Sequence, residues 1–137
     1  MTSLAVAVVW LWLGMVLAIS FLEAPLKFRV VDIPTGLGIG RVVFRALNAV
    51  ETVLAAALGF ALLSGDPGRT AAAASIGAIV VLAAQVVGVR PALTRRSDAV
   101  LAGTAPADAP RSHAHWWYVG LEVLKVSALV TAGLALF

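Results

Sequence analysis

Four long apolar runs, separated by shorter polar stretches, dominate the pattern of hydrophobic and polar positions along the chain. A helix needs about 20 predominantly apolar residues to cross about 30 Å of hydrocarbon, and each run is close to this length or longer. We therefore predict an all-α membrane protein, a four-transmembrane-helix bundle that forms one domain over residues 1–137. The expected spans are residues 3–23, 37–64, 70–90 and 113–136.

The connections between the runs contain turn and helix-boundary signals. Pro25 disfavours helical geometry at the residue before it, so the first helix is expected to kink or stop there, and Pro91 predicts the same for the third. Thr35 is the expected N-cap of the second helix. Residues 65–68, GDPG, have the residue types of a tight turn, and residues 103–112 have the composition of a flexible linker.

The second run combines bilayer-spanning length with charged side chains. At 100° per residue, Arg41, Arg45, Asn48 and Glu51 fall within an arc of roughly 120° on one helical face. A charged group at the bilayer centre costs about 2.5–3.5 kcal/mol on insertion scales, so such residues normally face protein or a water-filled cavity. This helix therefore has a polar side that needs partners.

The other three runs carry polar residues at matching depths. On the fourth run the polar residues between His115 and Lys125 fall within an arc of roughly 80°, and Gln85 is the strongly polar residue inside the third run. We predict that the polar groups of all four helices meet in one half of the membrane. The candidate ligand-binding or ion-pathway residues are Glu23, Lys27, Arg41, Arg45, Asn48, Glu51, Gln85, His115, Tyr118, Glu122 and Lys125.

Three functional hypotheses follow from this cluster. A water-filled cavity would transport, conduct or bind a small polar or anionic solute, with Arg41 and Arg45 as anchors because a guanidinium presents a planar fork of donors; Glu51 and Glu122 would exchange protons. A dry ion-pair network would instead fix helix register in a structural or assembly subunit of a larger membrane complex. A membrane enzyme acting on a lipid or quinone would use His115 and Glu122 as acid and base.

Catalytic and metal-binding signals are weak. His115, Glu51 and Glu122 resemble the carboxylate and histidine sets of metal-binding helix bundles, but the chain has no Glu-x-x-His sequence. No Ser-His-acid spacing indicates nucleophilic catalysis, and Ser20 is expected to be an ordinary small residue within a span. We therefore expect neither a cofactor nor a catalytic residue. The glycine-rich stretch from Gly36 to Gly40 favours close helix packing over a phosphate loop.

Composition supports the membrane class and limits the partners. Hydrophobic residues make up 61% of the chain and charged residues 12%, whereas soluble domains have roughly 45–50% and 25%. The mean hydropathy is +1.00. The absence of cysteine excludes disulfides and thiolate metal sites. The pI near 10.2 indicates topology charges that face anionic inner-leaflet headgroups, and no nucleic-acid partner is expected.

Membrane orientation follows from the distribution of basic residues. The second connection holds Arg69 alone, and neither terminus has a basic residue. By the positive-inside rule the first and third loops are expected to be cytoplasmic and both termini outside. The basic residues in or beside those two loops are Lys27, Arg29, Arg41, Arg90, Arg95, Arg96 and Arg111.

Small and aromatic residues give further packing predictions. Gly14 and Ala18 on the first run lie four residues apart, as do Ala73 and Gly77 and then Ala84 and Gly88 on the third. Such pairs allow close helix approach within the chain or between two copies, so a homodimer remains an alternative. Trp12 is expected to serve simple packing or lipid contact. Three aromatic residues are expected to form an interfacial belt at the start of the fourth helix: Trp116, Trp117 and Tyr118.

Short motifs give the chain a family resemblance. The stretches FLEAPLKF after the first run, GRVVFRALNAVE in the second and VRPALTRRSDAV after the third resemble the small four-span membrane proteins of unknown function that include human transmembrane protein 205. The resemblance rests on Ala24-Pro25, Phe28, Arg41, Phe44 and Pro91, and it implies a four-helix membrane fold without established chemistry. Because bacterial members share these features, we expect an integral protein of the bacterial plasma membrane.

Overall fold

The computed structural model describes residues 1–110 and 112–137, which are helical except for short connections and chain ends. In chain order, the elements are α1 (Thr2–Val16), a π-helical segment η1 (Leu17–Glu23), α2 (Ala24–Lys27), α3 (Ile33–Leu63), α4 (Arg69–Ala84), a second π-helical segment η2 (Gln85–Val89), α5 (Arg90–Leu101) and α6 (His113–Ala135). The described residues form no β-strand. Arg111, one of the basic residues in the third loop, lies outside the described residues.

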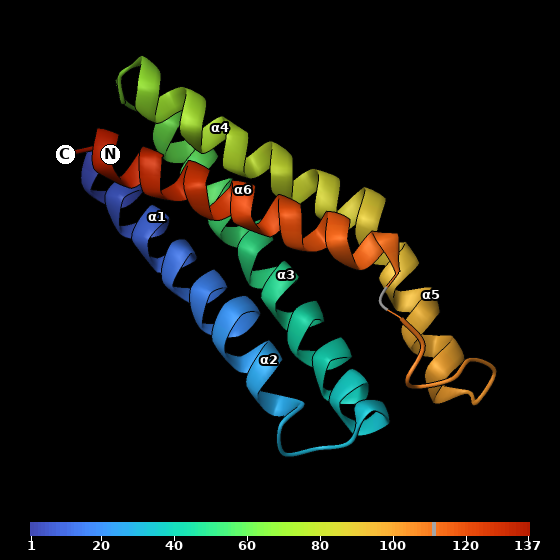
Figure 1. Ribbon diagram of the computed structural model, residues 1–137. Helices are drawn as coiled ribbons and strands as arrows, with labels where there is room; N and C mark the ends of the chain where they lie inside the picture. The colour runs from blue at the N-terminus through green and yellow to red at the C-terminus, as the bar shows by residue number, and fades with distance from the viewer. Residues whose placement is uncertain (111) are drawn as a thin grey trace.

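In the part of the chain that the structure describes, four continuous helical stretches are long and apolar enough to cross a membrane, which indicates an integral membrane protein. They are Thr2–Lys27, Ile33–Leu63, Arg69–Leu101 and His113–Ala135. Both termini lie at one end of the bundle, near the turn between α3 and α4 (Figure 1). We call this the terminal end, and the opposite end, which holds α2 and α5, the α5 end.

The first helix, which was expected to kink or stop at Pro25, does not stop there. Ala24 has helical angles (φ −56°, ψ −48°), and the helix continues to Lys27. Because proline has no N–H and its ring crowds the preceding turn, an uninterrupted α-helix would be strained here. The wider π-helical segment η1 relieves this strain, and the Ala24 N–H donates to the Ile19 carbonyl five residues back.

The third span also has a π-helical segment before its proline. The π-helical segment η2 lies directly before Arg90-Pro91, and the Arg90 N–H donates to the Gln85 carbonyl five residues back. The helix then kinks, as expected, into α5, which turns away from the line of α4 (Figure 1). Because the helix continues to Leu101, Gln85 lies well inside this helical stretch.

The N-terminus of α3 lies earlier than the sequence indicated. Asp32 is the N-cap, and its side chain accepts a hydrogen bond of 3.0 Å from the Thr35 N–H. Thr35, the expected cap, therefore lies inside the first turn. The predicted close packing at the glycines is present: Gly36 faces the Phe28 ring, and a Cβ on Gly40 would lie 3.1 Å from the Lys27 Nζ.

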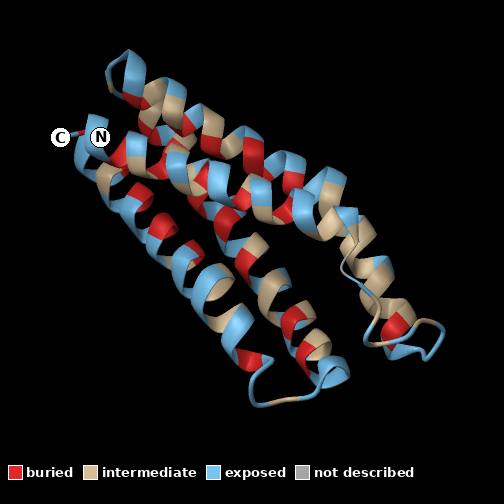
Figure 2. Ribbon diagram, in the orientation of Figure 1, coloured by how far each residue is buried: buried red, intermediate tan, exposed pale blue. Residues whose placement is uncertain are grey.

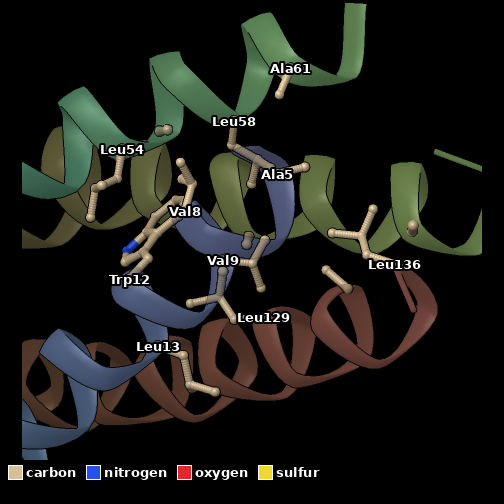
Figure 3. Packing of buried hydrophobic residues seen from close by; sticks show 14 of the residues in the cluster. Ala5, Val8, Val9, Trp12, Leu13, Leu54, Leu58, Ala61, Leu129 and Leu136 are labelled. Atoms are coloured by element: carbon tan, nitrogen blue, oxygen red, sulfur yellow. The ribbon is translucent and has the colours of Figure 1, made fainter. Parts of the chain in front are cut away.

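Apolar side chains fill the terminal half of the bundle. Buried residues follow the inner faces of the helices (Figure 2), and α6 packs against both α4 and α1. Close-up, Val8, Val9 and Trp12 of α1 meet Leu58 of α3 and Leu129 of α6 (Figure 3). This half of the molecule is thus an apolar core.

The small-residue pairs proposed for close approach on the third span do not face α6. Ala73 is exposed, and a Cβ on Gly77 would meet no atom within 4 Å. The buried face of α4 instead carries Ala71, Ser75 and Ala78. The strip containing Ala73 and Gly77 therefore makes no close packing contact within the chain.

Candidate functional site

Glu51 and Lys125 form a buried ion pair at the edge of the apolar core. Both side chains are 0% exposed, and Lys125 Nζ donates to Glu51 Oε1. The same Glu51 oxygen accepts a hydrogen bond of 2.9 Å from Trp12 Nε1. At 1.5 Å per residue, Glu51 lies about 18 Å along α3 from Leu63, so the pair lies in the middle part of this helix.

Glu122 is the second carboxylate of this network. Its Oε2 lies 3.0 Å from Lys125 Nζ and accepts a hydrogen bond of 2.6 Å from Gln85 Nε2. Its Oε1 accepts a hydrogen bond of 2.6 Å from Ser20 Oγ. The Gln85 amide oxygen accepts from Lys125 at 2.9 Å, so one amide bridges the ammonium and the carboxylate.

The buried network therefore takes side chains from all four spans. Its members are Trp12, Ser20, Glu51, Gln85, Glu122 and Lys125. Ser20 and Gln85 both lie in π-helical segments, η1 and η2. A π-turn alters the direction of the residues around it and often occurs at functional sites, so the two prolines help to place these two side chains.

A cavity of about 890 Å³ opens on the α5 side of the network. Its wall comes from η1, α2, α3, α5, the segment before α6 and the start of α6. Ser20 and Glu122 belong both to the buried network and to the cavity wall. The cavity therefore reaches the network through Glu122.

Cationic side chains outnumber carboxylates on the cavity wall. The cations are Lys27, Arg41, Arg45, Arg90 and Arg96, and the carboxylates are Asp108 and Glu122. This excess gives the cavity the electrostatic character of an anion site.

Several of these cations have partners within the chain. Lys27 pairs with Glu23 at 3.2 Å, and Arg41 pairs with Asp98. Arg96 donates to a backbone carbonyl.

Arg45 and Arg90 form no ion pair with any carboxylate in the part of the chain that the structure describes. The Arg90 guanidinium lies over the Phe44 ring at 5.4 Å and the Tyr118 ring at 6.0 Å. Aromatic faces hold a guanidinium in place without neutralising its charge. Arg90 is thus positioned by rings and keeps its positive charge on the cavity wall.

The structure divides the predicted site residues between three locations. Glu51, Gln85, Glu122 and Lys125 meet in the buried network, and Glu122 joins it to the cavity. The predicted residues on the cavity wall are Lys27, Arg41, Arg45, Asn48, His115, Tyr118 and Glu122. Glu23 instead lines a separate hollow of about 560 Å³ beside η1 and α2.

Tyr118 provides a further polar group at the cavity. The residue is 7% exposed, it lines the cavity, and its hydroxyl has no hydrogen-bond partner among the described residues. A buried hydroxyl is normally hydrogen-bonded. Ser20, a member of the buried network, interacts with this side chain.

The weak metal candidates do not assemble into a ligand set. Over residues 1–110 and 112–137, no three His, Cys, Asp or Glu side chains come close enough to hold a metal ion. His115 therefore does not join Glu51 and Glu122 as a ligand.

Sequence reasoning missed four members of the site. The sequence predicts packing or lipid contact for Trp12, an ordinary small residue at Ser20, and topology charges at Arg90 and Arg96. Trp12 was recognisable in principle, because a Trp in a span carries a donor that needs a partner when buried. The roles of Ser20 and Arg90 depend on π-turns and ring contacts, which the sequence pattern does not reveal.

No protein-family model, curated protein or solved structure matches the chain.

Proposed function

We propose that the protein binds a small anionic solute in the cavity at the α5 end and moves it across the membrane. The observation that carries this proposal is the presence of two cations, Arg45 and Arg90, on a cavity wall with no paired carboxylate. Uncompensated cations are costly at membrane depth and commonly mark ion or substrate pathways. An anion that enters the cavity would supply the missing charge.

The size and lining of the cavity favour a small organic anion. Ligand pockets usually measure about 300–1,000 Å³ and combine apolar walls with a few polar anchors, and the cavity of about 890 Å³ is within this range. Phe21, Phe28 and Phe44 contribute apolar surface to it. Arg45, Arg90 and the Tyr118 hydroxyl would bind the anionic group.

The proposal includes a membrane orientation. In a four-span bundle with both termini outside, the basic first and third loops are cytoplasmic. The cavity would then open toward the cytoplasm, where Arg95 and Arg96 of α5 face anionic headgroups. The resemblance to the four-span family that includes human transmembrane protein 205 supports this same fold, and we propose the chain as a relative of that family, residing in a bacterial plasma membrane.

A flux experiment tests this function. Proteoliposomes are loaded with chloride, sulfate, acetate or benzoate in parallel, and efflux is followed for each anion. We expect at least one anion to leave wild-type vesicles faster than empty ones, and Arg45→Gln combined with Arg90→Gln to reduce the rate at least tenfold. Arg69→Gln is the matched control, because Arg69 is exposed at the terminal end.

Equal flux from wild-type and empty vesicles for all four anions would overturn the proposal. Co-purification of a stoichiometric partner protein would then favour the alternative of a structural subunit, in which the buried charges fix helix register alone.

A further inference from the structure

The charges of the buried network do not balance. Glu51, Glu122 and Lys125 are 0%, 2% and 0% exposed, respectively. With both carboxylates ionised and the ammonium protonated, the set would carry one net negative charge away from water. An unpaired buried charge costs far more than an unpaired neutral polar group. One additional proton makes the set neutral.

The hydrogen bonds distinguish the two carboxyl groups. Both Glu122 oxygens accept from donors: Ser20 on Oε1, and Gln85 and Lys125 on Oε2. Several donors favour the ionised form of a carboxylate. Glu51 is different, because Trp12 and Lys125 both donate to Oε1, and Oε2 is buried without a partner.

We propose that Glu51, Lys125 and Glu122 form a proton-binding site that holds one proton, on Oε2 of Glu51. The proton neutralises the Glu51 carboxyl group and is bound at its oxygen that has no donor. It leaves Lys125 positive and Glu122 negative, as a neutral pair beside a neutral acid.

The cation that pairs with Glu51 is shared with Glu122. From α1 Glu51 meets the neutral Trp12, and from α6 the cation Lys125, which Glu122 shares. From η2, the neutral Gln85 also contacts Lys125. The next ionisable groups, Arg90 and Tyr118, act on it electrostatically without a hydrogen bond or ion pair.

The proton site is coupled to the cavity through Glu122. This coupling rests on the proposed anion-binding function, whereas the proton site itself does not. Glu122 lies on the cavity wall. An anion bound there raises the cost of a negative charge on the network, so anion binding and proton retention favour one another, as reciprocal linkage requires. The anion would therefore hold the proton in place, and would draw a proton in where the site has lost it.

Infrared difference spectroscopy of the purified protein in H₂O and D₂O at neutral pH tests the proton site directly. A neutral carboxylic acid has a carbonyl stretch at higher frequency than a carboxylate, and the band shifts in D₂O. We expect this band in the wild-type protein. By the charge count, Glu51→Gln and Glu122→Gln each abolish it, since one carboxylate then balances Lys125. Lys125→Gln, which removes the ammonium, approximately doubles the band.

Two milder variants identify the protonated residue. Trp12→Phe removes the donor to the Glu51 carbonyl oxygen, so it should raise the frequency of the band. Ser20→Ala, which removes a donor to Glu122, should leave the frequency unchanged. Absence of the band from the wild-type protein, which needs no variant to fold, overturns the proposal. A shift caused by Ser20→Ala and not by Trp12→Phe also overturns it, because the proton would then be on Glu122.

The coupling is tested by adding sodium benzoate to weakly buffered protein that contains a pH-indicator dye. The pH is set where the infrared band of the wild-type protein is partly lost. There wild-type protein should take up protons when benzoate binds, whereas Glu51→Gln should bind benzoate without proton uptake. Binding to wild-type protein without proton uptake would overturn the coupling. If benzoate does not bind at all, the proposed function fails for this anion, whereas the infrared result still decides the proton site.

Discussion

At the scale of single residues, Lys125 has the central position in the molecule. Its ammonium contacts Glu51, Glu122 and Gln85, which lie on three different helical segments. Removal of one partner from a buried ion pair leaves an uncompensated charge, which is costlier than replacement of the whole pair by apolar groups. The buried network therefore depends on this one cation more than on any of its other members.

Lys125→Gln should lower the free energy of unfolding by about 3–5 kcal/mol, the usual cost of breaking a buried pair. Denaturant titration of the protein in detergent measures the change. Ser127→Ala on the same helix is the control, because Ser127 is exposed and bonds only to its own helix backbone. A Lys125→Gln protein as stable as the Ser127→Ala protein would contradict the central position of Lys125.

Asp32 provides a test at the surface, outside the membrane-spanning segments. Hydrogen bonds from the Thr35 side chain and then its backbone N–H lower the pKa of the Asp32 carboxyl below 3.8. A lowered folded pKa means that this cap stabilises the protein above the unfolded pKa and loses its effect as pH falls through the lowered value. The loss is therefore confined to pH below about 4.

An NMR titration of the Asp32 carboxyl measures this pKa. Thr35→Val removes the side-chain donor but keeps the backbone N–H, so the pKa should rise toward 3.8 without reaching it. A pKa above 3.8 in the unsubstituted protein would show that Asp32 is not the cap.

At the scale of elements, two helices are interrupted in the same way. Each has a π-helical segment directly before a proline step, Ala24-Pro25 or Arg90-Pro91. Each π-helical segment also supplies one residue of the buried network. Ser20 lies in η1, and Gln85 is the first residue of η2. The prolines thus shape the site through the course of the helix backbone.

Pro91→Ala should weaken the site. Alanine restores an N–H that can reach the carbonyl four residues back, which favours a regular α-helix over η2. The turn containing Gln85 would then rotate, and its buried amide would lose partners at a cost of about 1–3 kcal/mol in unfolding free energy. Pro106→Ala, in an exposed connection, is the control. Equal stability of the two variants would contradict this role for Pro91.

The sequence predicted the elements better than their details. The apolar runs were long enough to reveal four helices, and the 3.6-residue period placed Glu51, Glu122 and Lys125 on inward faces. It could not reveal that Pro25 leaves its helix unbroken, because the outcome depends on whether a π-turn forms upstream. It also could not reveal that Arg45 lacks a carboxylate, because pairing between helices depends on their rotation and splay.

At the scale of the whole molecule, three layers follow one another along the bundle. The apolar core fills the terminal half, the buried network lies next to it, and the cavity opens at the α5 end. Helices α2 and α5 diverge at that end (Figure 1). The cavity is therefore open at the α5 end, and Glu122 lies where it meets the buried network.

The proposed orientation predicts which surfaces an impermeant reagent reaches. Because the chain has no cysteine, single cysteines can be introduced without background. Asp66→Cys, in the turn at the terminal end, should react with a membrane-impermeant maleimide added to intact cells. Ala107→Cys, in the connection after α5, should react only after the membrane is opened. The reverse pattern would invert the topology and place the cavity on the outside.

The central claim is that the cavity binds an anion through Arg45 and Arg90. The most direct test is equilibrium binding measured by thermal unfolding at constant ionic strength. A ligand that binds only the folded state stabilises it by about 2.7 kcal/mol at 100 times its Kd. We predict that at least one of chloride, sulfate, acetate and benzoate raises the Tm saturably in the wild-type and Arg69→Gln proteins, and that the combined Arg45→Gln and Arg90→Gln variant loses this rise. The same response in the double variant and the wild type, or no saturable response to any of the four anions, would contradict the claim.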